Sequence, residues 1–567
     1  MEFRIVPCGM DYDAAKNSAD VLTSAKITPL VAGLSLITGY KIGESSQYLS
    51  SVLTTEDVDK LEYGSSIAVF SPTGAGKSWT IEQIALALSK DKQVIILTNR
   101  HACEIQLKQE LSRKSGMNPI PAELLDNINI SDNLKVMTYQ KFVKICHCYN
   151  GKETVLFLDE CHCFTEDAVF STYPQQMIQF LHRNLDKTIR VYITATPEAV
   201  LPALWKLEAK DDSKLSPLTA DNLNDFLRFT PVKSSTRIQM TYLMKSDWSY
   251  LTFKAYDPDN LVKLAEYLNS LAKDGKKSLI YINDIQKGKE LQELLDESQH
   301  VYSDEDKKPE LTEITENSRF DTSALITTKV AENGLSLHDE DLTNIIAETY
   351  DLTALQQIIG RARVSRKTPR EITVLIPDYT ASHLGSITGK IYMQIQEFDK
   401  AVNNPDFAMQ YLPQPNPCIY YDALLKKPVV NEIGRQELQR QKDFVQTLRD
   451  EEAEQPHAFV RHVLEMYGKS TDNIDKIFID YDNISDCKNR IHTAWETFKS
   501  SRKTDNDLNI LKNTLMSACN ETGAYGKELK SNIQINTINK ILKFADIQDS
   551  LNPGETIFSI NSPEENN

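Results

Sequence analysis

The chain has 567 residues, of which 41% are hydrophobic and 25% are charged, so it can bury several cores and two to four domains are expected. Its net charge of −17 argues against a protein that coats nucleic acid through bulk electrostatics, which leaves a local groove as the way to contact phosphates. Nine cysteines without a secreted-scaffold pattern, and an N-terminus without signal-peptide features, favour a soluble cytoplasmic protein in a reducing compartment.

Two series of short aliphatic runs lie between about Gly64 and Asp378, and longer amphipathic stretches separate the runs. This alternation is typical of βαβ units in a parallel sheet, so two series predict two sheets. The first series comprises residues 67–70, 94–97, 134–137, 154–158 and 189–193, and the second comprises residues 278–282, 324–327, 344–347 and 372–376. We therefore expect an α/β fold with two tandem parallel-sheet lobes.

The remaining segments set the predicted domain boundaries. Residues 231–259 are either a linker or the opening strands of the second lobe, and we place the boundary near Phe229. Apolar residues have helical spacing over 435–448 and 458–467, which predicts an α-helical C-terminal region. The expected parts are an N-terminal extension (1–60), a first lobe (61–229), a second lobe (230–381), a helical domain (382–551) and a disordered tail (552–567).

A glycine-containing loop follows the predicted strand 67–70 and precedes a helical stretch. Its glycines allow the backbone to wrap a phosphate, and the amides that open the helix then point at the phosphate oxygens. Lys77 is placed to reach the β and γ phosphates and Ser78 to bind Mg²⁺. The alternative is an ordinary glycine-rich turn. The loop consists of Ser71, Pro72, Thr73, Gly74, Ala75, Gly76, Lys77 and Ser78.

An acidic pair, Asp159 and Glu160, follows the predicted strand 154–158, at the sheet edge where ligands collect in open α/β sheets. Asp159 is expected to bind Mg²⁺, mainly through water, and Glu160 to act as general base on the attacking water. The alternative for such a pair is a solvated turn.

A second basic and polar string, from Gln357 to Arg363, lies in the second predicted lobe. Phosphoryl transfer spreads negative charge over the equatorial oxygens, and an arginine supplied across a cleft stabilises that charge. Arg361 and Arg363 are the candidates for this role. The alternative is a solvated basic helix, because further cations follow closely.

Taken in order, these segments resemble the motifs of the superfamily 2 helicases, in particular the DExH-box group, whose two lobes are RecA-like. The likeness covers roughly residues 60 to 380. The loop resembles motif I, residues 159–162 resemble motif II in its DECH form, and residues 194–196 resemble motif III. Residues 326–337 (ITTKVAENGLSL) resemble motif V and residues 357–363 (QIIGRAR) resemble motif VI. Residues 98–100 and 138–140 are weaker likenesses to the strand-contacting motifs of the first lobe.

The resemblance implies ATP and Mg²⁺ as cofactors and gives roles to further residues. Motif VI supplies Gln357 and the arginine finger, for which Arg363 is preferred. His162, Thr194 and Thr196 couple hydrolysis to lobe movement, and Gly334 and Ser336 contact the nucleotide. The family usually has an aspartate where this chain has Ser336, so the sugar contact departs from the pattern. The DECH and QxxGRAR pairing is similar to the Dicer and RIG-I-like branch, but phage and restriction motors share most of it.

Polar residues after the strands are candidates to contact nucleic acid, either DNA or RNA. Motors of this family hold a strand's phosphates with amides, hydroxyls and a few cations, which an acidic protein can supply. Ordinary strand-end capping is the alternative for each threonine. The candidates are Thr98, Arg100, Thr138, Thr327 and Thr328.

Two Cys-x-Cys strings, residues 146–148 and 161–163, suggest zinc, but their spacing is tighter than in usual zinc sites and the second overlaps motif II. Cysteine packing against the sheet is the preferred interpretation.

The leading hypothesis is an ATP-dependent helicase or translocase. The alternatives are a duplex translocase that does not separate strands, and an ATP-gated nucleic-acid sensor or scaffold. The C-terminal helices are expected to pack across the lobes or to recruit a protein partner.

Overall fold

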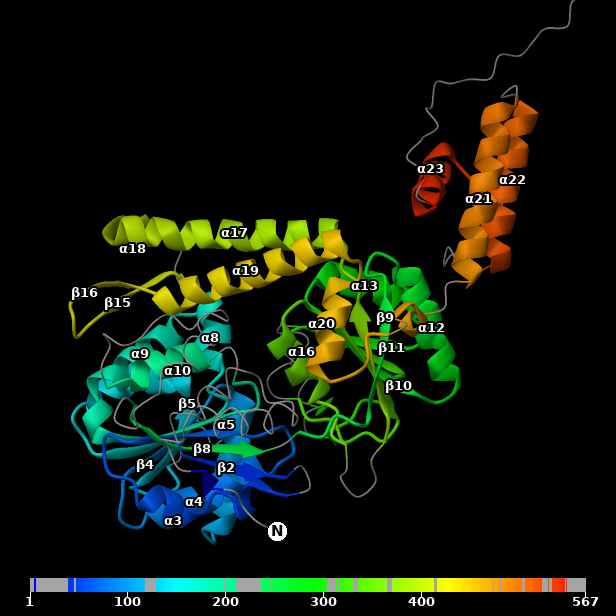
Figure 1. The fold of residues 1–567 in the computed structure, drawn as a ribbon. Helices are drawn as coiled ribbons and strands as arrows, with labels where there is room; N and C mark the ends of the chain where they lie inside the picture. Colours follow the sequence, from blue (N-terminus) through cyan, green and yellow to red (C-terminus); the bar gives the residue numbers. More distant parts are fainter. Residues whose placement is uncertain are drawn as a thin grey trace, which may run out of the picture.

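The computed structural model of the chain describes residues 5–6, 39–44, 47–117, 129–197, 200–210, 236–244, 246–302, 310, 313–314, 317–329, 335–364, 370–411, 416–472, 474–479, 482–501, 505–522, 529, 533–545 and 547. Two α/β lobes lie side by side, and long helices cross above them (Figure 1). Within the described ranges, no helix combines the length and the apolar character that crossing a bilayer requires.

The first lobe is built on an eight-stranded sheet, whose strands are parallel except for the antiparallel pair β1–β2. The order across the sheet is β1 (Ile5–Val6), β2 (Gly39–Gly43), β8 (Ile238–Met244), β3 (Ser66–Phe70), β7 (Thr188–Thr194), β6 (Thr154–Leu158), β4 (Val94–Thr98) and β5 (Leu134–Thr138). Five of these strands match the five runs predicted from sequence to within a residue at each end. The central strands are buried on both faces because helices cover each side.

Two hydrophobic cores lie on the two faces of this sheet. On one face, α3 (Thr55–Asp59), α4 (Lys77–Leu88) and α5 (His101–Lys114) pack on alternate strand residues such as Ile67 and Val69. On the other face, α7 (Tyr139–Ile145), α9 (Tyr173–Arg183) and α10 (Leu201–Glu208) pack on residues such as Ile95 and Leu97. The short helix α8 (Cys163–Glu166) joins this second core.

Two strands of this sheet, β2 and β8, come from segments that were predicted to belong to the N-terminal extension and to the second lobe. The boundary predicted between residues 229 and 230 is wrong, because β8 pairs in parallel with β3 and therefore belongs to the first lobe. β2 pairs with β8, and Leu49, Val52 and Val58 pack in the same core, so residues 39–60 are part of this lobe rather than an extension. The chain passes from the first lobe to the second between the end of β8 and the start of β9. This point lies within the segment 231–259, which the sequence left open.

The second lobe is a six-stranded parallel sheet. The order is β11 (Ser298–Val301), β12 (Ala324–Thr327), β10 (Lys277–Ile282), β13 (Leu342–Glu348), β14 (Ile372–Pro377) and β9 (Leu251–Tyr256). Four strands match the predicted runs, β9 is an opening strand within the segment 231–259 that was left open, and β11 was not predicted. Helices α12 (Leu261–Lys273) and α13 (Ile285–Leu294) cover one face. The α/β fold with two tandem parallel-sheet lobes is thus confirmed.

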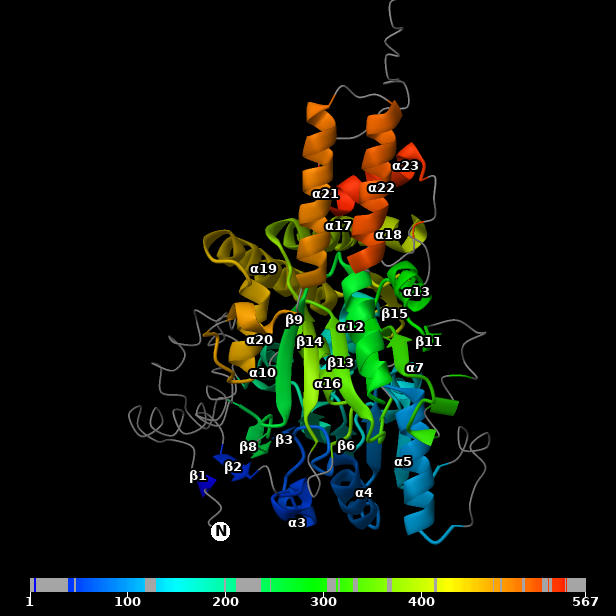
Figure 2. The same ribbon diagram turned by 90° about the vertical axis from the view of Figure 1, so that its right-hand side faces the viewer.

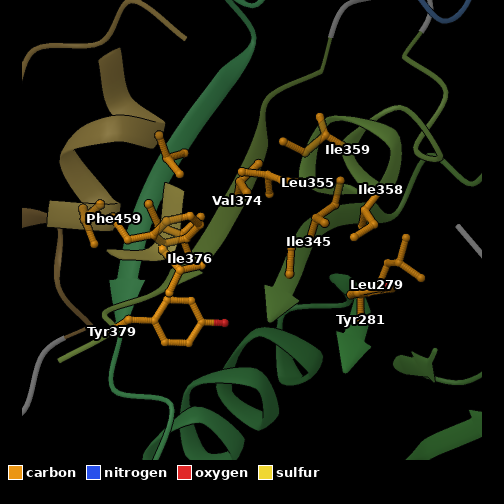
Figure 3. Close-up of a cluster of buried hydrophobic side chains, with 14 of the residues drawn as sticks. Leu279, Tyr281, Ile345, Leu355, Ile358, Ile359, Val374, Ile376, Tyr379 and Phe459 are labelled. Carbon is orange, nitrogen blue, oxygen red and sulfur yellow. The ribbon is translucent and has the colours of Figure 1, made fainter. Parts of the chain in front are cut away.

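The other face of the second sheet packs on α16 (Leu352–Ile359) and on helices that follow the lobe in sequence. Figure 3 shows Leu355, Ile358 and Ile359 of α16 close to the strand residues Ile345 and Val374. Phe459, from the C-terminal region, lies in the same cluster. This lobe therefore completes its core with residues from outside the predicted limits 230–381.

The C-terminal region begins with two long antiparallel elements, α17 (Ala381–Asn403) and α19 (Glu432–Glu454), which run above both lobes (Figure 1). Between them lie α18 (Pro405–Tyr411) and an antiparallel hairpin of β15 (Ile419–Asp422) and β16 (Lys427–Val430). After α19, α20 (Ala458–Met466) packs against the second sheet. The predicted helical region is confirmed, with the hairpin as an addition.

The first turn of α19 is fixed to the first lobe by Asn431, which is fully buried. Its Nδ2 lies 2.7 Å from the carbonyl oxygen of Ala168 and 3.1 Å from that of Ser171, and its Oδ1 accepts the amide of Gly434 at 3.1 Å. A Cβ added to Gly434 would lie 2.3 Å from the Ala168 oxygen. Because the rest of α19 packs in the core of the second lobe, this helix joins both lobes.

The last three helices form a separate unit. α21 (Asp482–Ser500), α22 (Asp505–Thr522) and α23 (Ile535–Phe544) have their own core, which includes Trp495, Leu515 and Ile541. Figures 1 and 2 show this unit standing clear of the lobes. The predicted single domain 382–551 therefore consists of two parts. The predicted tail, 552–567, lies outside the described residues.

Candidate functional site

The phosphate loop connects β3 to α4 and turns on two glycines. Gly74 and Gly76 have φ of 79° and 80°, a left-handed conformation that side chains with a Cβ rarely adopt. Lys77 is buried, and its Nζ donates to the Ser71 carbonyl oxygen at 3.1 Å. Ser78 is exposed in the first turn of α4. The loop therefore places the N-terminal amide groups of α4 beside Lys77. These amides and the positive end of the helix dipole favour the binding of an anion there.

The acidic pair lies at the end of β6, facing the phosphate loop. The Nζ of Lys77 is 3.6 Å from Oε1 of Glu160, whose φ of 51° is unusual for a residue with a side chain. Burial and the Glu160 carboxylate raise the pKa of Asp159 to about 7. Burial acts in the same direction on Glu160, but Lys77, His162 and Arg361 outweigh it and hold the pKa of that carboxyl below its usual value. Glu160 is thus the ionised member of the pair at neutral pH.

Asp159 has a further property that bears on metal binding. Its Oδ1 is buried and has no hydrogen-bond partner among the described residues. A buried carboxylate oxygen without a partner is unfavourable unless a cation or a donor meets it. Together with the hydroxyl of Ser78, it offers the hard oxygen ligands that Mg²⁺ prefers.

A chain of polar contacts leads from Glu160 to the end of β7. His162 is buried, and its Nδ1 lies 3.3 Å from Oε2 of Glu160 and 3.1 Å from Oγ1 of Thr194. The Thr194 hydroxyl in turn accepts the amide of Thr196 at 3.0 Å. The three residues predicted to couple hydrolysis to movement are therefore in contact with one another and with Glu160.

Two glutamines of α16 continue this chain into the second lobe. Nε2 of Gln357 donates to Oγ1 of Thr196 at 3.2 Å, and Nε2 of Gln356 donates to the Ala195 carbonyl oxygen at 3.2 Å. The Oε1 of Gln357 accepts a hydrogen bond from Nη2 of Arg361 at 2.9 Å. Motif III and motif VI are thus joined by direct hydrogen bonds between the lobes.

The two arginines are held by the backbone and the side chain of motif V. Nη1 of Arg361 donates to the Leu335 carbonyl oxygen at 3.3 Å, and Nε of Arg363 donates to Oγ of Ser336 at 2.6 Å. Burial and the charge of Arg361 lower the pKa of Arg363 to about 10, so Arg363 remains a cation at neutral pH. Ser336 orients an arginine here, a role that the sequence did not indicate. Gly334 lies outside the described residues.

The lobes meet closely where motif VI faces the phosphate loop. A Cβ added to Gly360 would lie 2.6 Å from Oγ1 of Thr73, so this glycine allows the approach. Beside this contact is a cavity of about 630 Å³, whose walls include Ser71, Ala195 and Trp248, together with residues of α16, α19 and α20. The structure therefore brings the predicted residues of both lobes to one site, with open space next to it.

The residues predicted to contact nucleic acid are placed differently. The side chains of Thr98, Thr138, Thr327 and Thr328 are buried, and Thr138 caps α7 by accepting the amide of Lys141 at 3.2 Å. Arg100 is partly exposed, and its Nη2 lies 3.2 Å from Oδ1 of Asp167. Contacts from the four threonine hydroxyls require a rearrangement of this conformation, whereas Arg100 is accessible.

Cys161 and Cys163 pack in the core beside Phe164. The predicted packing of this pair is confirmed.

A family model matches part of the first lobe. Residues 47–199 are similar to the family described as type III restriction enzyme, res subunit. The predicted relationship to the superfamily 2 helicases is confirmed by this match, while the DECH subtype stays a prediction. No curated protein matches the sequence.

Several solved helicase structures are similar to the chain at low sequence identity. Mss116p bound to ssRNA and AMP-PNP is 12% identical, with 84% of this chain and 99% of that chain covered and a TM-score of 0.40. S. cerevisiae Dbp5 bound to RNA and ADP BeF3 is 14% identical, with 57% and 82% covered and a TM-score of 0.37. The Mycobacterium smegmatis helicase Lhr bound to ssDNA and AMP-PNP is 12% identical, with 66% and 58% covered and a TM-score of 0.38.

Sequence reasoning missed three contributors to the site. Gln356 bonds across the lobes, and Gly360 allows them to approach. Cys103, at the start of α5, is close enough to Asp159 for its charge, together with burial, to raise the pKa of the thiol to about 11. The pair of adjacent glutamines was a usable signal for Gln356, whereas the other two depend on how the lobes dock.

Proposed function

We propose that the protein is a DExH-type motor that hydrolyses ATP with Mg²⁺ between its two lobes and uses the cycle to move on nucleic acid. One observation carries the proposal: a continuous chain of polar contacts runs from Lys77 and Glu160, through Thr194 and Thr196, to Gln357 and Arg361. A static scaffold has no need for such a chain between two lobes.

The residues of the first lobe would bind and activate the nucleotide. The loop from Ser71 to Ser78 holds the phosphates with its amides, and Lys77 neutralises the β and γ phosphates. Mg²⁺ would be held by Ser78 and Asp159, and when bound it would neutralise charge on the phosphate oxygens. Glu160, kept ionised by its cationic neighbours, orients the attacking water and accepts its proton.

The residues of the second lobe would act on the transition state. The charge of Arg361 lowers the pKa of Glu160, and the charge of Glu160 raises the pKa of Arg363, so both arginines lie near this carboxylate. Their guanidinium groups stabilise charge that develops on the transferred phosphoryl group. Ser336 and Gln357 hold them in place, so that hydrolysis and phosphate release alter the contact between the lobes.

A second candidate is a translocase that follows duplex DNA without separating the strands, and the match to the res subunit of type III restriction enzymes favours it. Unwinding of a forked duplex and displacement of a third strand separate the two candidates, because a pure translocase scores only in displacement.

ATP turnover measured with single-stranded and duplex DNA and RNA tests the proposed function. We expect at least one of these four to stimulate the wild type in proportion to its length, and Lys77→Ala and Glu160→Gln to abolish that stimulation. Lys60→Ala changes an exposed lysine at the C-terminal end of α3, serves as control and keeps wild-type turnover. The proposal is contradicted if none of the four nucleic acids changes the rate of ATP turnover, or if turnover persists in Lys77→Ala. Stimulation without any dependence on length supports the ATP-gated sensor instead.

A further inference from the structure

The last helix, α23, differs in charge from the rest of the chain. The protein has 80 acidic residues and a net charge of −17, yet residues 529–545 contain three lysines and no aspartate or glutamate. Ile538, Ile541 and Leu542 are buried in the core of the three-helix unit. The acid-free composition is therefore presented to solvent by one face of a folded helix.

That face consists of hydrogen-bond donors at helical spacing. Asn536, Lys540 and Lys543 are exposed and stand at positions i, i+4 and i+7, so they follow one stripe along α23. Lysine ammonium groups and amides are the groups that proteins use on phosphate oxygens, without reading base sequence.

The position of the three-helix unit relates this stripe to the motor. Ile479, three residues before α21, donates its amide to the Ala255 carbonyl oxygen at 3.0 Å, next to the carboxyl end of β9. The strands from β12 to β9 are parallel, so their carboxyl ends lie at one edge of the sheet. Thr327, a predicted nucleic-acid contact, ends β12 at this same edge.

The span of this edge from β12 to β9 is short enough for a single nucleic acid to cover. Four strand spacings separate β12 from β9, which is roughly 19 Å at about 4.8 Å per spacing. Duplex nucleic acid covers that length in roughly six base pairs at about 3.4 Å each. A strand or duplex that follows this edge from β12 would therefore reach the segment that leads into α21 within one helical turn. Figure 2 shows α21 rising above β9 and α12.

We propose that α21–α23 is an auxiliary nucleic-acid-binding module that contacts the phosphate backbone through Asn536, Lys540 and Lys543 on α23. The inference rests on the proposed function, since it places the module on the nucleic acid that the lobes translocate. In this proposal, α23 supplies a local cationic site away from the ATP cleft, although the chain as a whole is acidic. The contact is independent of sequence and sensitive to salt.

The test measures the affinity of the full-length protein for fluorescein-labelled 30-mers of DNA and RNA, single-stranded and duplex, over a range of salt. Each phosphate contact adds about 0.9 on duplex DNA, or about 0.7 on a single strand, to the magnitude of the slope of log affinity against log salt, so Lys540→Gln/Lys543→Gln should lower that magnitude by about 1.8 or about 1.4. Between about 50 and about 200 mM salt, the advantage of the wild type over this variant should then shrink about twelvefold on duplex DNA and about sevenfold on a single strand.

Matched variants make the result specific. Lys540→Arg/Lys543→Arg keeps the charges and should retain the wild-type slope. Lys60→Gln/Lys187→Gln removes two exposed lysines of the first lobe that pair with glutamates and should also leave the slope unchanged. ATP turnover without nucleic acid should be the same in every variant.

The outcomes separate this inference from the proposed function. If the wild type binds and is stimulated by nucleic acid but Lys540→Gln/Lys543→Gln retains the full slope, the module assignment is overturned and the motor remains. If no nucleic acid binds to the wild type or stimulates its turnover, the proposed function fails and the assignment fails with it.

Discussion

The hydrogen bond between Gln357 and Thr196 is expected to couple the two lobes, and a double-mutant cycle measures that coupling. Both side chains are buried, and Gln357 also accepts from Arg361. Gln357→Leu keeps a similar volume but leaves the Arg361 guanidinium without this acceptor. A hydrogen bond to a charged group contributes about 1.5–3 kcal/mol, so kcat should fall by about tenfold to 150-fold.

Thr196→Val removes the bond to Gln357, together with a long contact of 3.5 Å with the Thr194 hydroxyl. That bond is neutral and contributes about 1 kcal/mol, so turnover should fall by about fivefold. In a Gln357→Leu background, the same change should have almost no effect on turnover, because the partner is already absent. The two losses should therefore be less than additive by about 1 kcal/mol.

The assay is ATP turnover at saturating nucleic acid, with KM for ATP measured in parallel. KM should stay near the wild-type value because the phosphate loop belongs to the first lobe and is unchanged, so the loss should fall on kcat. Gln439→Leu is the control: it removes a bond to Asp443 on the exposed side of α19, away from the cavity, and should leave kcat unchanged. Losses that add to within about 0.5 kcal/mol would refute coupling through this bond.

Three further predictions concern stability, metal binding and the C-terminal helices. Glu208→Gln leaves the fully buried Arg190 without its ionised partner and should destabilise the first lobe by about 3–5 kcal/mol, measured by chemical denaturation; an unchanged midpoint refutes this. The raised pKa of about 7 keeps Asp159 protonated below that pH. The Mg²⁺ concentration that half-saturates ATP turnover should therefore rise as the pH falls from 7 to 6 and stay constant above 8. A flat profile contradicts the assignment of Asp159 as a Mg²⁺ ligand. Gly434→Ala places a Cβ 2.3 Å from the Ala168 oxygen and should detach α19 from the first lobe, seen as faster hydrogen exchange in both segments; unchanged exchange in the variant counts against this anchor.

The sequence predicts the parts of the fold that depend on local pattern. The runs at β3, β4, β6 and β7 are buried on both faces, so their continuous apolar character marks them as strands. β8 contains Gln239 and Thr241 and pairs with β3 across a long stretch of chain, and β11 has only four residues. Their membership of a sheet is decided by tertiary pairing, which no local pattern records.

The same division applies to the site. Lys77, Asp159 and Glu160 follow their strands directly, so their common position follows from the carboxyl-edge rule. The contact of Gly360 with Thr73 and the bond of Arg363 to Ser336 depend on how the second lobe docks and folds back on itself. Burial of the strand-end threonines is likewise a tertiary property, which the polar character of threonine does not reveal.

The late arrival of α20 in sequence has a consequence for biosynthesis. The second sheet is complete at Pro377, but Phe459 and Tyr467 belong to its core. About 90 residues separate Pro377 from Tyr467, so a ribosome at about 5–20 residues per second leaves part of one face of that sheet uncovered for about 5 to 18 seconds. During this interval α16 already packs on the face, but the strand residues that later contact Phe459 and Tyr467 lack those partners.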